Sequence, residues 1–384
     1  MPSLEIRLHK GVSEIDAERW NELVDSDHPF TAHAFLAGLE LHDCIRAEHG
    51  WQSAPLGLYE NGNLVAAAPL YLKGNSHGEF VFDWSWASAY ARHGLDYYPK
   101  LLCAVPYSPV TGPRLLVGSD PGADRRRLAV LAAIRQQTAQ FDLSSAHLNF
   151  VNETDAIGVS GSDWLPRFDW QFHWTNRGWG DFDDFLAALK PKKRKNIRQE
   201  RQHVVAAGVT CEIRHGDEVD DEDWRILHRL YRSNFAAHGN HPALTEGFFR
   251  HLGQHMPHQT VAVLCRRGGR IIAAALCLRS SDTLYGRYWG AEEQIPGLHF
   301  EACYYQGIDY CIRHGMQRFE PGAQGEHKIA RGFLPVRTRS FHHVRDGRFA
   351  SAIAEALQRE ALGLEMYRED LLAHSPYAEA LESA

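Results

Sequence analysis

The stretch Gly62-Asn63-Leu64-Val65-Ala66-Ala67-Ala68 decides the fold, because it returns as Gly269-Arg270-Ile271-Ile272-Ala273-Ala274-Ala275. Two flanking blocks return in the same order. The His-Pro pair at 28–29 returns at 241–242, and Gly94-Leu95 returns as Gly297-Leu298. This period is far longer than the roughly 20–50 residues of solenoid repeats. The three collinear matches therefore predict two similar domains in tandem.

Each copy predicts the same order of elements. Thr31 or Thr245 is placed to cap the N-terminus of a helix. A strand at 54–59 or 260–265 then leads through a glycine turn to a second strand at 64–72 or 271–278. An aromatic third strand at 80–84 or 283–289 precedes a helix that starts near Gly94 or Gly297.

Further strands are predicted at 144–151, 170–176 and 337–344. The mixture of helices and antiparallel strands predicts an α+β fold. We expect an N-terminal domain at 1–165 and a C-terminal domain at 166–384. The second includes a basic helix at 190–207 and a C-terminal helix at 348–373.

Composition narrows the function. The 384 residues carry a net charge of −7, which argues against a globally basic nucleic-acid coat, and we expect no DNA partner. No apolar run approaches the roughly 18 residues of a membrane helix, and the N-terminus shows no signal peptide, so we expect a cytoplasmic protein. The seven cysteines form no C-x-x-C pair and the 23 histidines no H-E-x-x-H motif. We therefore predict reduced thiols and no metal.

Several segments resemble a known family. A meander followed by a helix is the core of the GNAT acyltransferase fold, and two such domains with a basic helical insertion resemble the Fem-type aminoacyltransferases of bacterial cell-wall synthesis. The chain is most similar to the bacterial FemAB-like family of predicted N-acyltransferases. The matching segments are 28–30, 82–84, 97–100, 109–114, 192–198, 285–290 and 319–328. The resemblance implies tandem GNAT-like domains and transfer of an aminoacyl or acyl group to an amine of a cell-wall-type or small precursor.

The basic segment is a candidate phosphate contact. Four of the eight lysines lie between 190 and 195, and Arg194, Arg198 and Arg201 share one helical face. We assign phosphate or tRNA binding to Lys192, Lys193, Arg194, Lys195 and Arg198. Two other interpretations stay open, namely a solvated face without a partner and transient contact with an anionic membrane surface.

Acyl transfer to an amine needs a base and donors for the tetrahedral oxyanion. No Ser-His-Asp or Cys-His motif is evident, which favours direct transfer without an acyl-enzyme. The loop 320–328 combines glycines with ionisable side chains, as site loops often do. We assign Glu320 or His327 as the base, and Lys328 or Arg331 as the oxyanion or phosphate contact. The alternative is an ordinary turn with a buried ion pair.

Substrate binding is assigned to two aromatic segments and to Arg331. Arg287 alternates with Tyr288 along the third strand of the second copy, so Arg287 faces the site if Tyr285 and Trp289 share its side. Core aromatics with a salt-bridged arginine are the alternative. In the first copy, Asp83 next to Trp84 is a carboxylate in an apolar stretch, which is costly unless paired. Asp83 either binds the ammonium of an acceptor or pairs with Arg92 or Arg114.

Two classes of acyl donor are possible, aminoacyl-tRNA and acyl-CoA. The loop 290–297 does not fit the glycine-rich pyrophosphate loop of CoA-dependent GNAT enzymes, and Glu292 and Glu293 oppose an anion there. We therefore expect no tightly bound cofactor, with aminoacyl-tRNA as the donor and acyl-CoA as the alternative. A CoA-dependent N-acetyltransferase and a non-catalytic module that binds peptidoglycan precursors or RNA are the competing functions. The oligomeric state stays open.

Overall fold

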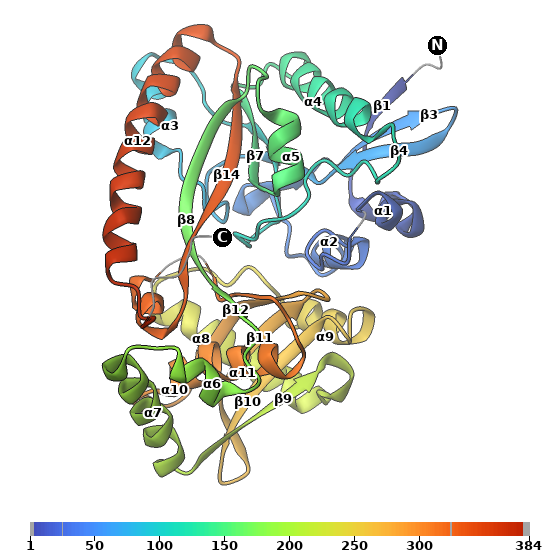
Figure 1. Cartoon of the computed structure of the whole chain (residues 1–384). Coiled ribbons are helices and arrows are strands. Elements are labelled where there is room, and N and C mark those ends of the chain that lie inside the picture. Colours follow the sequence, from blue (N-terminus) through green and yellow to red (C-terminus); the bar gives the residue numbers. More distant parts are fainter. Residues whose placement is uncertain (1–3, 25, 323–324, 379–384) are drawn as a thin grey trace. The chain divides into compact units, whose positions relative to one another are not determined.

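The computed structural model describes residues 4–24, 26–322 and 325–378. It forms two compact units: unit 1 is Met1–Asp169 with Arg337–Glu365, and unit 2 is Trp170–Val336 with Met366–Ala384. Three elements contribute residues to both units: β8 (Leu165–Thr175), β14 (Leu334–Val344) and α12 (Gly347–Ala373). Figure 1 shows these elements in green and red.

The division differs from the predicted domains at 1–165 and 166–384 in one respect. Residues 337–365 belong to unit 1, although they follow unit 2 in sequence. The reason is strand pairing and packing, because β14 pairs with β7 (Ser145–Val151) and Phe349 at the start of α12 stacks on Tyr90.

Unit 1 holds the first meander and includes β7 and parts of β8, β14 and α12. Its other helices and strands are β1 (Leu4–Leu8), η1 (Val12–Glu14), α1 (Ala17–Val24), α2 (His33–Leu41), η2 (Ala47–His49), β2 (Trp51–Ser53), β3 (Leu56–Glu60), β4 (Asn63–Ala68), β5 (Leu70–Lys73), α3 (Trp84–Arg92), β6 (Lys100–Cys103), α4 (Ala123–Gln140) and α5 (Glu153–Val159). One sheet has the order β1-β3-β4, and the strands of the second follow as β2-β5-β6-β7-β14-β8.

Unit 2 holds the second meander. Its elements are α6 (Phe182–Ala187), α7 (Pro191–Ala206), β9 (Val209–His215), η3 (Gly216–Glu218), α8 (Asp221–Ala237), α9 (Glu246–His255), β10 (Thr260–Arg267), β11 (Arg270–Arg279), β12 (Thr283–Ala291), α10 (Leu298–Phe300), η4 (Glu301–Tyr305), α11 (Gln306–Arg313), β13 (Arg318–Glu320) and η5 (Glu326–Arg331). Its strands follow the order β8-β13-β12-β11-β10-β9.

The predicted repeat is visible in both units. In each unit, antiparallel strands are followed by two parallel strands that a helix connects. These are β6-α4-β7 in unit 1 and β12-α11-β13 in unit 2. The quoted stretches form the second strands of the hairpins β3-β4 and β10-β11. The α+β prediction is confirmed.

The predicted third strand of the first copy, 80–84, is wrong. Asp83 is the N-cap residue of α3, and Trp86 and Tyr90 are buried one helical turn apart. The alternation of Phe82, Asp83 and Trp84 imitates a strand, but the next residues follow the helical period. The third strand is β6, and the helix expected near Gly94 begins instead with α4.

Two other local predictions need correction. Pro69 divides the predicted strand 64–72 into β4 and β5, which lie in different sheets, because proline cannot donate to a sheet ladder. Thr245 caps α9, accepting a hydrogen bond from the backbone N–H of Phe248, as predicted. Thr31 does not cap a helix, since α2 starts at His33 and Thr31 contacts His28.

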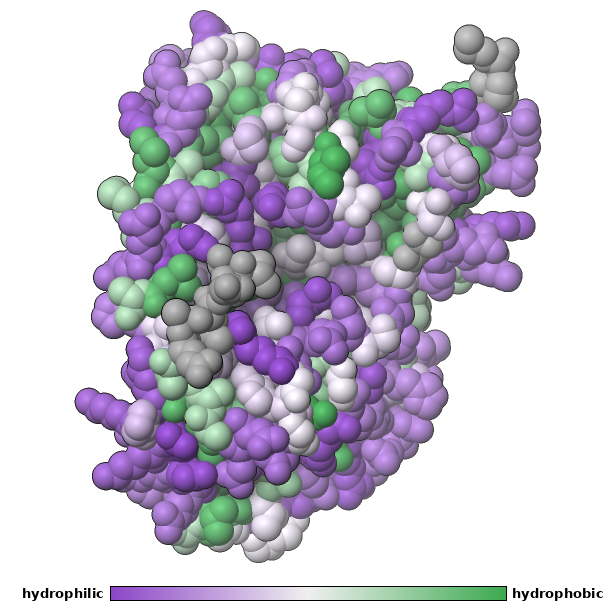
Figure 2. All heavy atoms as spheres, viewed as in Figure 1, coloured by the Kyte–Doolittle hydropathy of each residue, from purple (hydrophilic) through white to green (hydrophobic). Residues whose placement is uncertain are grey.

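The units have separate hydrophobic cores. Leu58, Leu101 and Ile134 are buried in unit 1, whereas Phe185, Tyr305 and Phe319 are buried in unit 2. The face drawn in Figure 2 is mostly hydrophilic, and hydrophilic side chains protrude at its lower left, where Figure 1 draws α7. Within the described ranges, no helix is both long enough and apolar enough to cross a membrane.

Candidate functional site

Glu320 ends a strand in the middle of the unit 2 sheet. It is the last residue of β13, which pairs with β12 in parallel and with β8 in antiparallel register. Tyr285 of β12 lies opposite Glu320, and Phe319 lies opposite Trp174 of β8. The carboxylate is thus placed by a parallel strand pair, where the chain leaves the sheet.

The Glu320 carboxyl group is buried without a full set of partners. The Nη2 atom of Arg287 lies 3.8 Å from Oε2, and Nδ1 of His173 lies 3.8 Å from Oε1. Oε2 accepts no hydrogen bond from any described residue. Burial raises the pKa of Glu320 to about 7, although the positive charge of Arg287 opposes the shift. Burial also lowers the pKa of His173 to about 3, so the imidazole is neutral.

Lys328 is a second buried ionisable group in the same segment. It lies in η5, and its Nζ donates to the backbone oxygen of Gly322 at 2.7 Å. Burial, and then the charge of Arg287, lower the pKa of Lys328 to about 7. The charge of Arg287 thus acts on the ionisation of both Glu320 and Lys328.

The other predicted residues of this loop are engaged within unit 2. His327 Nε2 lies 2.9 Å from the hydroxyl of Tyr304, and burial lowers the pKa of His327. Arg331 donates to both carboxylate oxygens of Glu200 in α7, at 2.6 and 3.2 Å, and lies over the ring of Phe300. Arg331 therefore links η5 to α7, and its predicted contact with a ligand stays a prediction.

A π-helical turn, η4, supplies the tyrosines of this arrangement. Tyr304 contacts His327, and Tyr305 donates to Glu200 and accepts from Arg331 at 3.1 Å. Such wide turns often occur at functional sites, because the extra residue re-aims the side chains that follow. The turn thus joins α7, α11 and η5 through hydrogen bonds.

Arg287 is the extra residue of a β-bulge in β12, because Leu276 pairs with Tyr288 and Cys277 with Gly286. The bulge interrupts the strict alternation on which the prediction for Arg287 and Tyr288 rests. Arg287 points toward Glu320, and its Nη1 donates to the Gly286 and Glu320 carbonyl oxygens at 2.8 and 3.3 Å. Tyr288 packs against Tyr231 and Phe249, which belong to α8 and α9. Tyr288 thus lies in an aromatic cluster and also interacts electrostatically with Arg287.

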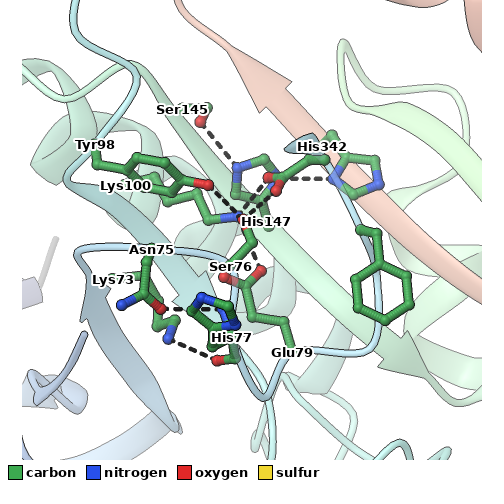
Figure 3. A network of polar contacts seen from close by, with 12 residues as sticks. Lys73, Asn75, Ser76, His77, Glu79, Tyr98, Lys100, Ser145, His147 and His342 are labelled. Atoms are coloured by element: carbon green, nitrogen blue, oxygen red, sulfur yellow. Dashed lines mark hydrogen bonds and ion pairs between the residues drawn. The ribbon is translucent and has the colours of Figure 1, made fainter. Parts of the chain in front are cut away.

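Asp83 lies in a different cluster, inside unit 1, together with Ser76 and Lys100, which Figure 3 labels. Lys100 of β6 donates to Glu79 at 2.8 Å and to Asp83, and Tyr97 donates to Asp83 at 2.5 Å. Ser76 also donates to Asp83. The predicted partners Arg92 and Arg114 are wrong. Arg92 is exposed at the end of α3, and the Arg114 guanidinium donates to backbone carbonyl oxygens, including that of Val110 at 2.5 Å.

Histidines extend the unit 1 cluster. His147 Nε2 lies 2.8 Å from the Ser145 hydroxyl, and His147 Nδ1 lies 2.7 Å from Nδ1 of His342 (Figure 3). Burial raises the pKa of Glu79 to about 7 and lowers that of Lys73 to about 7. For Asp83, burial opposes ionisation, but Lys100 and its hydrogen bonds outweigh it and lower the pKa.

Trp84, the neighbour of Asp83, is exposed. Its ring stacks on that of Phe82, with 4.7 Å between the ring centroids. Asp83 and Trp84 are both predicted to bind substrate, but the Asp83 side chain is buried in the ion cluster and that of Trp84 lies on the surface of α3.

The basic helix is present as α7, with Pro191 in its first turn. Lys192, Lys193, Arg194 and Lys195 make no ion pair with any residue of the described ranges, whereas Arg198 pairs with exposed Asp183 at 3.1 Å. Lys192 and Lys193 stand in the first turn of α7, at the positive end of the helix dipole, which disfavours cations. The predicted phosphate contact of this helix stays a prediction.

The loop expected to oppose CoA follows β12. Glu292 pairs with Arg229 and Arg270, and Glu293 with Arg267, so arginines balance both carboxylates. The space beside Gly297 limits CoA binding more than the charges of these two carboxylates do. A Cβ atom at Gly297 would lie 2.6 Å from the backbone oxygen of Glu200. The start of α10 therefore has α7 directly against it, where a CoA pyrophosphate would need room.

In the described part of the chain, no group of three or more His, Cys, Asp or Glu side chains is arranged to hold a metal ion. All seven cysteines are free thiols. Sequence reasoning missed His173, Glu79 and the role of Lys100. Their signal was an ionisable residue within, or next to, an apolar strand, which is rare unless it has a partner.

Comparison with solved structures shows the same fold. The C-terminal domain of a putative lysylphosphatidylglycerol synthetase from Agrobacterium fabrum superposes with a TM-score of 0.53 at 11% identity, covering 91% of this chain and 97% of that one. FemX gives 0.52 at 12%, covering 88% and 98%. L-PGS from Bacillus licheniformis gives 0.51 at 11%, covering 87% and 97%.

Sequence comparison identifies a family but no curated relative. No curated protein sequence matches the chain. A family model for FemAB-like proteins, described as peptidoglycan biosynthesis/recognition, matches residues 11–379. Because that match spans nearly the entire sequence, the chain belongs to the FemAB-like family.

Proposed function

We propose that this protein is a Fem-type N-acyltransferase, which moves an aminoacyl or acyl group to an amine of a cell-wall-type or other small precursor. The observation that carries the proposal is the buried group of Glu320, Arg287 and Lys328 in unit 2. Membership of the FemAB-like family and the fold shared with FemX support it.

The pKa values fit acid–base work at neutral pH. A carboxyl group with a pKa of about 7 is a stronger base than an ordinary glutamate and is still partly ionised at pH 7. Lys328, with a pKa of about 7, is partly protonated under the same conditions. Groups matched to the working pH in this way are typical of catalytic sites.

In the proposed reaction, the acceptor amine attacks the carbonyl carbon of the donor ester or thioester, forming a C–N bond. Glu320 takes the proton that the amine loses. Arg287 and protonated Lys328 donate to the oxyanion. The tetrahedral intermediate then collapses, the C–O or C–S bond breaks, and Glu320 returns the proton to the leaving group. No acyl-enzyme is needed.

We propose aminoacyl-tRNA as the donor, because the unpaired cations of α7 suit a phosphate backbone. The contact residues are Lys192, Lys193, Arg194, Lys195 and Arg198. The close approach of Gly297 to Glu200 argues against CoA in the usual slot.

The test is mass spectrometry of acyl transfer from a panel of aminoacyl-tRNAs and acyl-CoAs to amine acceptors. We expect transfer from aminoacyl-tRNA with a bell-shaped pH profile centred near pH 7, since the reaction needs ionised Glu320 and protonated Lys328. Glu320→Gln should lower the rate about 100-fold or more and abolish the acidic limb. Lys10→Met, a change at an exposed lysine of unit 1, is the control for Lys328→Met.

Three results would contradict the proposal. Transfer from acyl-CoA alone would favour the N-acetyltransferase. Binding without transfer from any donor would favour a non-catalytic module. Full activity of folded Glu320→Gln and Lys328→Met variants would exclude the assigned residues.

Donor binding is tested separately by salt dependence. The affinity for aminoacyl-tRNA should fall steeply with salt, because each neutralised phosphate releases counterions. Changing Lys192, Lys193 and Arg194 together to Ala should reduce the slope of log K against log salt by about 2. An unchanged slope would remove α7 from the donor site.

A further inference from the structure

Two thiols face each other across a strand pair in unit 2. Cys211 of β9 is the direct partner of Cys265 of β10 in the antiparallel register. Their Sγ atoms are 2.7 Å apart. This is closer than two unbonded sulfur atoms normally approach.

The backbone geometry already suits a disulfide. Directly opposed residues of an antiparallel pair have Cα atoms about 4.5 or 5.5 Å apart, and both values lie within the range of about 4.4–6.8 Å seen for disulfides. Bond formation therefore needs only a small movement of the two sulfur atoms. The 54 residues between the two cysteines in sequence hide this proximity, which only the fold reveals.

The two thiols differ in access to solvent. Cys211 is half-buried on the outermost strand, β9, whereas Cys265 is fully buried against Val204 and Ala302. An oxidant in solution thus reaches Cys211 first, and Cys265 is held beside it as the resolving thiol. This is the arrangement found in redox-sensitive cysteine pairs.

We propose that Cys211 and Cys265 are a redox modification site, which a peroxide converts to an intramolecular disulfide and a thiol reductant restores. The Cys211 thiolate attacks one peroxide oxygen, the O–O bond breaks, and a sulfenic acid and water result. The Cys265 sulfur then attacks Cys211 Sγ, and hydroxide leaves as a second water once protonated. The two sulfur atoms lose two electrons, and the two peroxide oxygens gain them.

A disulfide between Cys211 and Cys265 would fix the edge of the unit 2 sheet. β9 is an edge strand, held on one side only by β10, and it follows α7 after a two-residue turn. A covalent link between β9 and β10 fixes the strand from which the basic helix extends. The modification does not depend on the proposed acyl transfer, since no residue assigned to that reaction takes part.

To test this proposal, the full chain is treated with hydrogen peroxide. The remaining thiols are then blocked with N-ethylmaleimide, and the protein is digested with trypsin. Cleavage after Arg and Lys releases Cys211 in peptide 202–214 and Cys265 in peptide 251–266. We expect these two peptides to be cross-linked, with a loss of 2 Da, and dithiothreitol to separate them. Cys303→Ser, a change at another unit 2 thiol, should leave the cross-link unaltered.

Three outcomes would overturn the inference. One is a Cys211 oxidised to the sulfinic acid while Cys265 is alkylated. Another is a cross-link between peptide 251–266 and peptide 288–313, which contains Cys303 and Cys311. The third is full alkylation of both thiols after peroxide treatment that oxidises a reference dithiol. Because the wild-type chain gives the result, the test does not depend on a variant that folds.

Discussion

Lys100→Met should destabilise unit 1 strongly. Lys100 is fully buried, and its ammonium group is the only cation bonded to Asp83 among the described residues. The same group donates to Glu79 at 2.8 Å. Methionine keeps the approximate volume and the unbranched shape, so the change removes charge and leaves packing largely intact.

The magnitude follows from what remains. Asp83 is 2% exposed, and in the variant its carboxylate keeps only the hydroxyl groups of Ser76 and Tyr97. Removing one partner of a buried ion pair costs about 3–5 kcal/mol, because the other charge stays buried. The carboxyl group escapes part of this cost by taking up a proton, because the loss of the Lys100 charge removes the main cause that lowers its pKa.

Urea denaturation at pH 7 measures the free energy of unfolding of the wild type and the variant. Lys192→Met, at an exposed and unpaired lysine, is the matched control and should change it by less than about 0.5 kcal/mol. Asp83→Asn in the Lys100→Met background should recover a large part of the loss. A loss below about 1 kcal/mol, or no recovery in the double variant, would refute the account of a charge-balanced cluster.

Three other variants test separate parts of the fold. Glu79→Gln should alter the pH dependence of stability. The pKa of Glu79 in the folded protein is about 7, above the ordinary value of 4.5, so the free energy of unfolding of the wild type falls by up to about 1.4 kcal/mol per pH unit as pH rises between those values, and that of the variant should not. The same pH dependence in urea denaturation of both proteins would contradict the burial of this carboxyl. Thr245→Ala should cost about 1 kcal/mol by removing the cap of α9, measured by chemical denaturation, and a neutral result would reject the cap. Gly297→Ala should lower the melting temperature more than Gly239→Ala, since both have a positive φ but only Gly297 meets the Glu200 backbone; equal losses would show that α7 yields.

Periodic patterns predicted most of the elements. The hairpins around 62 and 269, helix α7 and helix α12 all follow from local sequence, because turn glycines and helical spacing act over a few residues. The stretch 80–84 failed, since three alternating residues cannot distinguish a strand from the start of a helix. Only Trp86 and Tyr90, which come later, reveal the helical period.

The candidate site was only partly predictable. Glu320 and Lys328 stand in a loop whose glycines and charges mark it in the sequence. Their neighbour His173 is far away in sequence, and the pairing of β8 with β13 brings it to Glu320. Asp83 was given the wrong partners for a related reason. The sequence does not distinguish Arg92 and Arg114 from Lys100 as cations for Asp83, whereas the fold of unit 1 places Lys100 beside it.

The ion pair between Arg331 and Glu200 links the basic helix α7 to the 3-10 helix η5 within unit 2. Glu200 lies two residues after Arg198 on the basic helix, and Arg331 lies three residues after Lys328. A ligand that pulls on α7 therefore also pulls on the 3-10 turn that carries Lys328, since two hydrogen bonds join them. If the donor binds α7 as proposed, we therefore expect its binding to be coupled to the position of Lys328.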